Sequence, residues 1–414
     1  MPTVFVNKRG VGSLTRGIAE AHLFTYDRGV APGNAVSLLM PTPASQESPP
    51  YAAERPTLLH PVFDQNLPEG ALREAISRMF AKALPIFDDF ALLEIVGRSL
   101  IGRLRFAASP ADLEGEMPTQ NIAALLKAQG TAGLFRDLLD RYARYSGISG
   151  VQPKLLVRDD GTLLTSQLSP PIRQGTRLTY PGSTHIIKGF DTREYPDIAA
   201  NEFACLQAAR ASGLPTPNVM LANDGGLLVI ERFDLKPDGS YLGFEDLCSL
   251  SGRHSREKYE GSYEQVVKTL KIFLSSPQGI DIDLRNLFKS LVLSVVVRNG
   301  DAHRKNFGVL YDAATESPVA LAPTYDVLTT TPYVAGDTMA LTLDGSKRWP
   351  GSKGLVRFGM NHCQLREVDA ELAIEEVANG VARARNELER IANKEIREKV
   401  RNAWEEGLAN SKRG

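Results

Sequence analysis

LFKSLVLSVVVRNGDAHRKN (residues 287–306) joins an apolar helical pattern to a polar loop. Leu287, Leu291 and Val295 recur at every fourth position, which predicts a buried helix over 287–297. Asp301 and Asn306 then stand five positions apart, ahead of an apolar run that predicts a strand. Carboxylate and amide oxygens are hard ligands of the kind that Mg²⁺ prefers. We therefore expect a loop, anchored by a helix and a strand, that holds two oxygen ligands rigidly.

The spacing of this aspartate and asparagine is typical of one chemistry. Protein kinases use D-x-x-x-x-N in the catalytic loop, where the Asp receives the proton of the substrate hydroxyl and the Asn binds magnesium. His303, Arg304 and Lys305 lie between the two and could donate hydrogen bonds to phosphate oxygens. Asp326 follows Asn306 by 20 residues, beyond a predicted hairpin, where a kinase-like lobe places a second metal ligand. The alternative is a polar turn after a buried helix, since Asn-Gly alone marks a turn.

The amino-terminal half offers groups that such a lobe would need. Lys188 ends a predicted strand and resembles the strand lysine that contacts nucleotide phosphates, and Glu202 on the next helix could pair with it. A lone strand-end lysine is usually a solvated charge, so the hypothesis depends on both residues. SGISGVQPK (146–154) could let backbone N–H groups approach phosphates, or it could be a generic Gly/Ser turn. IERF (230–233) ends a predicted buried strand. Its backbone could form a hinge that faces adenine, or the segment could be a simple strand end with an ion pair at the surface.

Composition and charge restrict the class of protein. The chain has 414 residues, which exceeds one average domain, and it is 43% hydrophobic and 23% charged, as globular proteins are. The 48 basic and 49 acidic residues nearly cancel, which argues against a protein whose main work is to coat nucleic acid. Its 3 cysteines form no CxxC pair, which indicates a reducing compartment. Neither a signal peptide nor a membrane-spanning run is recognisable, so we expect a soluble cytoplasmic protein without a membrane partner.

Periodicity and turn residues predict an α/β (α+β) fold in three parts. These are a small α+β domain at 1–110, a strand-rich nucleotide-binding lobe at 111–240 and a helical catalytic lobe at 241–414. Together they would form a bilobal, protein-kinase-like fold with ATP between the two larger lobes. The expected strands are 3–6, 11–14, 22–26, 35–40, 154–157, 162–165, 184–188, 226–233, 307–311 and 319–322. The expected helices are 68–80, 88–95, 201–212, 266–274, 287–297, 372–391 and 396–404.

The motifs taken together resemble the HipA-type toxin serine/threonine kinases of bacterial type II toxin–antitoxin systems. In the larger lobes the resemblance is carried by SGISGVQPK (146–154), THIIK (184–188), ERFD (231–234), Glu245-Asp246, NGDAHRKNF (299–307) and PTYDV (323–327). In the amino-terminal part it is carried by GVGSLTRG (10–17), AHLFTY (21–26) and FDQNLPEGALRE (63–74). The motifs follow the family order over nearly the whole chain.

The resemblance implies a role for each matching position. Asp301 would be the catalytic base, with Asn306 and Asp326 on Mg²⁺. Ser149 would be an autophosphorylated serine whose modification ejects its loop, because it adds about −2 charge beside the ATP phosphates. The ATP-binding residues would be Val151, Gln152, Pro153, Lys154, Leu155, Leu156, Lys188, Glu231, Arg232, Phe233, His303, Arg304, Lys305, Asn306, Tyr325 and Asp326.

The resemblance also implies an activity and partners. The chain would phosphorylate a protein of the translation machinery, such as an aminoacyl-tRNA synthetase, and so arrest growth and favour persistence. A small helix-turn-helix antitoxin, HipB-like, would neutralise it, and operator DNA would be bound only indirectly through that antitoxin. Two alternatives remain open, namely a small-molecule kinase of the aminoglycoside or choline type and a non-catalytic co-repressor that binds the antitoxin.

Overall fold

The computed structural model describes residues 2–16, 21–43, 50–52, 57–80, 82–84, 86–113, 117–160, 182–189 and 194–412. They form two compact units, which we describe separately. Unit 1 comprises Met1–Gly189, Ala222–Glu245 and Tyr311–Ser317, and unit 2 comprises Phe190–Leu221, Asp246–Leu310 and Pro318–Gly414. The predicted α/β class is confirmed, whereas the division into three domains stays a prediction.

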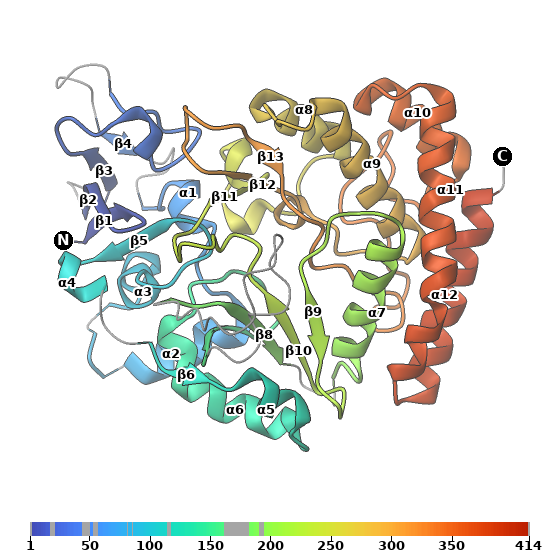
Figure 1. The fold of residues 1–414 in the computed structure, drawn as a ribbon, viewed down its shortest axis with the longest axis horizontal. Coiled ribbons are helices and arrows are strands. Elements are labelled where there is room, and N and C mark those ends of the chain that lie inside the picture. The colour runs from blue at the N-terminus through green and yellow to red at the C-terminus, as the bar shows by residue number, and fades with distance from the viewer. Residues whose placement is uncertain are drawn as a thin grey trace. The chain divides into compact units, whose positions relative to one another are not determined.

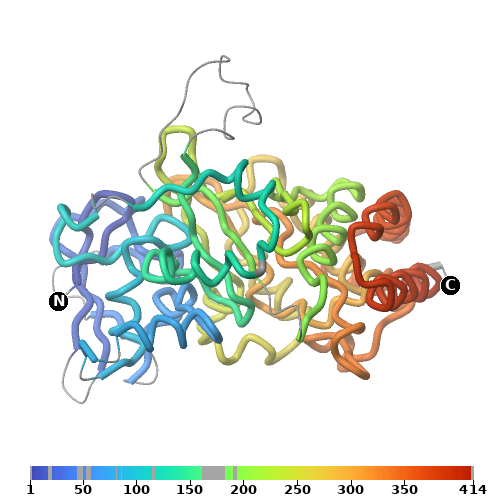
Figure 2. The backbone as a smooth tube through the Cα atoms, turned by 90° about the horizontal axis from the view of Figure 1, so that it is seen from below, coloured from blue at the N-terminus to red at the C-terminus, as the bar shows by residue number. Residues whose placement is uncertain are grey.

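The first sheet of unit 1 has the strand order β4-β3-β2-β1-β5. β1 pairs antiparallel with both β2 and β5, so β5 lies beside β1 although the two are far apart in the sequence (Figure 2). Phe63 of α1 contacts Phe24 and Phe106 edge-on, with both ring centroids 5.5 Å away, and so packs a helix onto the sheet. The strands are Thr3–Val6 (β1), Arg9–Arg16 (β2), His22–Tyr26 (β3), Tyr51–Ala52 (β4) and Leu104–Ala107 (β5), and the helices are Pro61–Asp64 (α1), Gly70–Phe80 (α2), Asp89–Val96 (α3) and Pro110–Leu113 (α4).

The strand expected at 35–40 is wrong. A 3₁₀ turn at Pro32–Asn34 precedes this segment, which then makes a single bridge between Ser37 and Met40. Its amides donate to side chains instead of to a neighbouring strand. Val36 N donates to the Tyr26 hydroxyl and Leu38 N donates to Glu245 Oε1, each over 2.8 Å. Tertiary acceptors have therefore overridden the local strand pattern.

The second sheet of unit 1 contains β6, β7, β8 and β10, hydrogen-bonded in this order. Leu155, Ile187 and Val229 are fully buried on successive strands and form its core. The elements are Thr119–Gln120 (β6), Ile122–Lys127 (α5), Thr131–Tyr142 (α6), Lys154–Asp159 (β7), His185–Gly189 (β8) and Leu227–Glu231 (β10). A further strand, Gly243–Asp246 (β11), is not part of this sheet. The strand expected at 162–165 lies outside the described residues.

Unit 2 is mainly helical, and Figure 1 shows α9 to α12 gathered as neighbouring helices. The buried Lys289 of α9 forms an ion pair with Glu376 of α11 over 3.0 Å and donates to Ser212 O at the end of α7. The predicted hairpin is confirmed, with Val309 opposite Leu321. The elements are Ile198–Ala211 (α7), Val219–Leu221 (β9), Tyr263–Phe273 (α8), Ile280–Val296 (α9), Gly308–Tyr311 (β12), Ala320–Leu321 (β13), Ser352–Cys363 (α10), Glu367–Arg383 (α11) and Lys394–Lys412 (α12).

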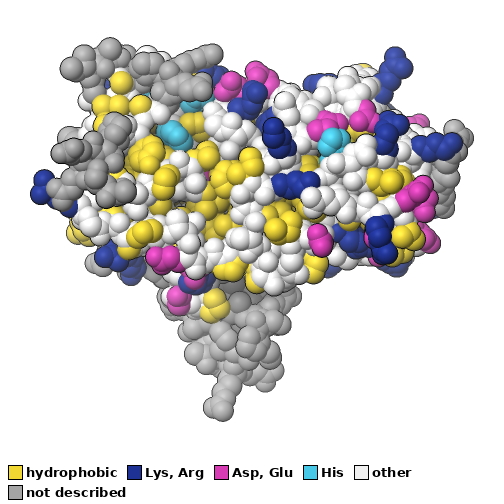
Figure 3. All heavy atoms as spheres, turned by 90° about the horizontal axis from the view of Figure 1, so that it is seen from above, with side chains coloured by type: hydrophobic (Ala, Val, Ile, Leu, Met, Phe, Trp, Pro, Cys, Tyr) yellow, Lys and Arg dark blue, Asp and Glu magenta, His cyan; other side chains and the backbone are white. Residues whose placement is uncertain are grey.

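The surface of the last helices in unit 2 carries basic and acidic side chains in alternation (Figure 3). Lys399 and Glu395 of α12, for example, pair over 2.6 Å. Among the described helices, none is both long enough and apolar enough to cross a bilayer.

Candidate active site

The loop at 298–306 follows the buried helix α9, as predicted. Arg298 has a φ of +58°, in the left-handed region, which turns the chain out of the helix. Gly300 N then donates to Thr330 Oγ1 over 2.7 Å, and Asp301 N donates to Asn299 Oδ1 over 3.1 Å. Side chains within unit 2 thus fix the backbone on which Asp301 sits.

The carboxylate of Asp301 is half-buried and accepts a short hydrogen bond. The Tyr259 hydroxyl donates to Asp301 Oδ1 over 2.5 Å. Tyr259 is 44% exposed, and its ring lies edge-on to His303 with the centroids 5.0 Å apart. A bond to an ionised acceptor is stronger than one between neutral groups, so Tyr259 orients the carboxylate. No spacing in the sequence points to this tyrosine.

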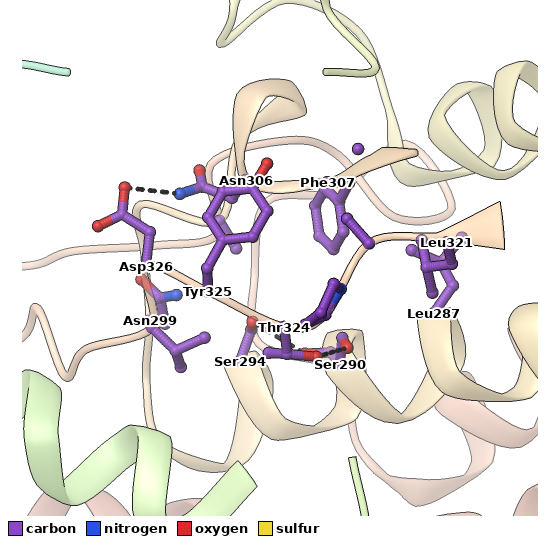
Figure 4. Close-up of a pocket in the computed structure, with 15 residues that line it drawn as sticks. Leu287, Ser290, Ser294, Asn299, Asn306, Phe307, Leu321, Thr324, Tyr325 and Asp326 are labelled. Atoms are coloured by element: carbon purple, nitrogen blue, oxygen red, sulfur yellow. Dashed lines mark hydrogen bonds between the residues drawn. The ribbon is translucent and has the colours of Figure 1, made fainter. Parts of the chain in front are cut away.

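The two predicted metal ligands lie together. Asn306 Nδ2 donates to Asp326 Oδ2 over 3.2 Å (Figure 4), and Asn306 Oδ1 accepts from His303 N over 3.0 Å. Asp326 has a φ of +57°, a conformation that costs energy in most residues and that Asp tolerates better. One carboxylate and one amide oxygen, completed by water and phosphate oxygens, make a donor set that Mg²⁺ accepts. The donor types present fit the predicted ion, although Asn306 presents its Nδ2 rather than its Oδ1 to Asp326 in this structure.

A small cavity lies behind these ligands. Its volume of about 20 Å³ is enough for a single water molecule, and α9 and the 321–327 segment line much of it (Figure 4). Ser290 and Thr324 share a hydrogen bond of 2.7 Å in its wall. Tyr325 donates to Lys305 O over 2.7 Å. Burial raises the pKa of Tyr325 well above its usual value, and the carboxylates of Asp246 and Asp326 act in the same direction, so the phenol stays a neutral donor.

His303 is buried and stays neutral at physiological pH. Burial, and then the nearby Lys258 ammonium, lower the pKa of His303 to about 3, although Asp326 opposes the shift. Its Nδ1 has no hydrogen-bond partner among the described residues. A neutral imidazole can offer one N–H to a phosphate oxygen but no positive charge.

Arg304 and Lys305 fix the loop to the segment before α8. Arg304 is 1% exposed, and its guanidinium donates to Glu260 O over 2.7 Å, to Ser251 Oγ over 3.0 Å and to the Gln265 side chain. All three of its nitrogens thus bind protein oxygens, which gives Arg304 a structural role. Lys305 donates to Ser255 Oγ over 2.8 Å and lies 3.8 Å from Asp246.

In unit 1, two predicted ATP-binding lysines lie opposite each other. Lys154 of β7 pairs with Lys188 of β8, and the two are only 5% and 3% exposed. Two buried ammonium groups on adjacent strands suit a polyphosphate that meets both. Gly150, with a φ of +126°, leaves room for the Lys154 ammonium, because a Cβ there would lie 2.3 Å from Nζ. The sequence predicted both lysines but not their pairing.

The loop at 146–153 is fixed at its two ends. Gly147 N donates to Ser99 O over 2.8 Å, and Gly189 N donates to Pro153 O over 3.1 Å. In the middle, the Ser149 hydroxyl donates to Glu69 Oε1 over 2.5 Å. Gln152 Oε1 is buried without a hydrogen-bond partner among the described residues, as expected of an atom that meets a ligand.

The predicted hinge at 231–233 contains an arginine that is used structurally. Arg232 is buried, forms an ion pair with Asp234 with Nε 2.9 Å from Oδ1, and donates to Leu100 O over 2.9 Å. Burial alone would raise the pKa of Asp234, but the Arg232 guanidinium holds this pKa below its usual value. Any contact of Arg232 with adenine would therefore involve its backbone. Phe233 contacts Phe244, with ring centroids 5.8 Å apart.

Glu202 and a cluster of potential metal ligands belong to unit 2. Lys188 belongs to unit 1 and the buried Glu202 to unit 2, so their ion pair stays a prediction. In unit 2, Glu264, Asp344 and His362 bring potential ligand atoms within 4.8 Å of one another. Asp344 already neutralises Arg357, with Nη2 2.5 Å and Nε 3.1 Å from its Oδ2, which weakens it as a metal ligand.

Comparison with known proteins identifies two family domains. Residues 146–393 match the HipA-like C-terminal domain, and residues 3–107 match the HipA N-terminal domain. The solved structure of HipA from Shewanella oneidensis MR-1, in a toxin–antitoxin complex with HipB and operator DNA, has the same fold. It has a TM-score of 0.68 at 16% identity, over 99% of this chain and 96% of that one.

Two relatives come from Sinorhizobium fredii (strain NBRC 101917 / NGR234). "Putative kinase Y4dM" is 30% identical over 309 residues, which is 70% of this chain and 66% of that protein. "Putative kinase Y4mE" is 29% identical over 292 residues, which is 66% of this chain and 64% of that protein. The chain thus spans slightly less than two thirds of the length of the curated relatives that it matches.

Proposed function

Because the chain belongs to the HipA family, we propose that it is an ATP-dependent kinase that phosphorylates serine or threonine in a protein. The observation that carries this proposal is the fixed loop at 298–306. It contains Asp301, whose backbone amide donates to Asn299 Oδ1, and Asn306, whose Nδ2 donates to Asp326 Oδ2. The two Sinorhizobium relatives are named putative kinases, which supports the kinase part of this proposal.

In the proposed reaction, Asp301 accepts the proton of the substrate hydroxyl. The hydroxyl oxygen forms a bond to the γ-phosphorus, the bond from that phosphorus to the β,γ-bridging oxygen breaks, and ADP leaves. Tyr259 keeps the Asp301 carboxylate in one orientation through its 2.5 Å hydrogen bond. Proton transfer to a positioned base contributes ~10²–10⁴-fold to such rates.

The nucleotide would be held mainly through its phosphates. Lys154 and Lys188 supply two buried positive charges on adjacent strands, which suits a triphosphate. Asn306 and Asp326 would hold Mg²⁺, which supplies charge neutralisation of the phosphates when it is bound. The backbone at 231–233 would contact the adenine.

Ser149 is proposed as an autophosphorylation site. Its hydroxyl is half-buried in the 146–153 loop, close in sequence to Lys154, which pairs with Lys188. A phosphate there adds about −2 charge to a loop that would otherwise meet the ATP phosphates, so modified enzyme should bind ATP poorly.

The proposed partner is a small helix-turn-helix antitoxin. The similar fold of the Shewanella protein, solved with HipB and operator DNA, supports this pairing. The chain would then act in the cytoplasm as the toxin of the pair. It would arrest growth by phosphorylating a protein of the translation machinery, of which an aminoacyl-tRNA synthetase is one example.

ADP release from Mg-ATP in the presence of a protein substrate mixture tests the activity. Wild type should release ADP and transfer phosphate to protein, whereas Asp301→Asn should lose at least about 100-fold of the rate. Asp281→Asn, an exposed aspartate at the start of α9, is the matched control and should match wild type. Equal rates in wild type and Asp301→Asn, with both folded by circular dichroism, would overturn the assignment.

A further inference from the structure

An aspartate of unit 2 lies directly against the 298–306 loop. Asp337 is half-buried, and a Cβ on Gly300 would overlap both of its carboxylate oxygens. The φ of Gly300 is not in the left-handed region, so glycine is needed here for space rather than for backbone freedom. Glycine at position 300 thus admits a carboxylate to the backbone immediately before Asp301.

The hydroxyl of Thr330 connects this carboxylate to the loop backbone. Gly300 N donates to Thr330 Oγ1 over 2.7 Å, which leaves the hydroxyl proton for one acceptor. Two acceptors lie within reach, namely Asp337 Oδ2, which forms a short contact, and Arg298 O at 3.0 Å. Because a carboxylate is the stronger acceptor of the two, the hydrogen bonds run from Gly300 N through Thr330 Oγ1 to Asp337.

The segment that carries Asp337 is itself a closed turn. Thr330 N donates to Arg298 O over 3.1 Å, and Val334 N donates back to Thr330 O over 3.1 Å. At the far end of the turn, Thr338 N donates to Asp337 Oδ1 over 2.9 Å. Thr330 is only 9% exposed, so little water competes for its hydroxyl. Both ends of the hydrogen-bond chain are therefore fixed before a substrate arrives, as the positioning of reacting groups requires.

We propose that Asp337 is a positioning residue for the proposed kinase reaction. Through the Thr330 hydroxyl it fixes the amide of Gly300, and so the direction in which the neighbouring Asp301 carboxylate faces the substrate hydroxyl. Tyr259 orients the same carboxylate through a bond to Oδ1, so separate hydrogen bonds hold the backbone and the side chain. The role in transfer rests on the proposed function, whereas the hold on Gly300 does not.

Steady-state kinetics tests the role in transfer. Asp337→Ala and Thr330→Val should each lower kcat roughly 10- to 30-fold, with the KM for ATP changed less than about twofold, because a misplaced base accepts the proton poorly. The double variant should be no slower than the slower single one, since both changes break one chain of hydrogen bonds. Thr330→Ser keeps the hydroxyl and should stay within about threefold of wild type. Asp281→Ala, at an exposed position of α9, is the matched control and should match wild type.

Hydrogen–deuterium exchange of residues 299–302, without nucleotide, tests the hold on Gly300. Asp337→Ala and Thr330→Val should each accelerate exchange there roughly tenfold, since each interrupts the chain of hydrogen bonds that begins at the Gly300 amide. Asp281→Ala should again match wild type. Exchange of α11 in the same samples reports whether each variant is folded.

The outcomes separate this role from the proposed function. If wild type is active and Asp337→Ala has the same kcat as Asp281→Ala, the role in transfer is overturned. Additive losses in the double variant, or a change confined to the KM for ATP, would overturn it as well. A wild type that transfers no phosphate would instead overturn the proposed function, and the role in transfer with it. Exchange decides the hold in either case, because equal exchange in Asp337→Ala and Asp281→Ala, with α11 protected, would overturn it.

Discussion

The loops at 298–306 and 146–153 carry the proposed chemistry, and they are held in opposite ways. In the first, a buried arginine, several backbone amides and a tyrosine fix nearly every residue. In the second, the ends are fixed while the middle meets Glu69 and exposes Val151 to 62%. A base and metal ligands need constant geometry, whereas a loop that is switched must have a contact that one modification can break.

The largest effect should come from replacing Asp326, the predicted metal ligand that accepts a hydrogen bond from Asn306 of the 298–306 loop. Asp326→Asn keeps a residue that tolerates a φ of +57° but replaces the carboxylate with a neutral amide. We expect phosphate transfer to fall by roughly 100-fold or more, because the site loses the charge that attracts Mg²⁺. The measurement is phosphate transfer over a range of Mg²⁺ concentrations, with Asp281→Asn in parallel. Unaltered transfer and Mg²⁺ dependence in Asp326→Asn would remove Asp326 from the metal site.

The next largest effect should come from replacing Arg304, which fixes the 298–306 loop to the segment before α8. Arg304→Met should lower the free energy of unfolding by about 2–4 kcal/mol, because Glu260 O, Ser251 Oγ and the Gln265 side chain would lose a buried charged donor. Arg256→Ala, at an exposed position nearby, should change it by less than about 0.5 kcal/mol. Chemical denaturation measures both. Similar losses in the two variants would show that Arg304 is not what holds this loop.

The buried His303 should make the free energy of unfolding fall at acid pH. Its pKa is about 3 when folded and near 6.5 when unfolded, so below pH 6.5 the unfolded chain binds a proton that the folded chain excludes. The free energy of unfolding of wild type should therefore fall relative to His303→Gln by roughly 1–2 kcal/mol between pH 7 and pH 5. Denaturation curves at the two pH values give this difference. Parallel pH dependence in the two proteins would mean that His303 is not excluded from water.

The smallest effect on phosphate transfer should come from removing the hydrogen bond that orients Asp301 while Asp301 itself is kept. Tyr259→Phe deletes the hydroxyl that donates to Asp301 Oδ1 and leaves the ring on His303. We expect transfer to slow by roughly 3- to 10-fold with little change in unfolding temperature, because the side chain is 44% exposed. Steady-state kinetics should show the change in kcat rather than in the KM for ATP. A change confined to KM would instead place Tyr259 in nucleotide binding.

Periodic patterns predicted much of the fold but not all of it. The helix at 287–297, the hairpin after 306 and the two carboxyl-terminal helices follow from apolar spacing, because each buries one face. α10 was not predicted, since its glycines weaken a helical pattern. Gly359 of α10 serves packing instead, because a Cβ there would lie 3.2 Å from the Phe288 ring.

The residues of the candidate site were likewise predicted only in part. Asp301, Asn306 and Asp326 were predicted because their spacing lies within one continuous stretch of chain. Tyr259, Glu69 and the pairing of Lys154 with Lys188 were not, because each depends on tertiary contacts between separate segments. Spacing along one segment is visible in a sequence, whereas contacts between segments are visible only in the folded chain.

Intact mass before and after incubation with Mg-ATP, for wild type and Asp301→Asn in parallel, tests whether Asp301 is the base of an active kinase. We expect one added phosphate in wild type, mapped to Ser149 by peptide analysis, and none in Asp301→Asn. Equal phosphate incorporation in the two proteins would contradict this role of Asp301, as would a wild type that neither gains phosphate nor releases ADP.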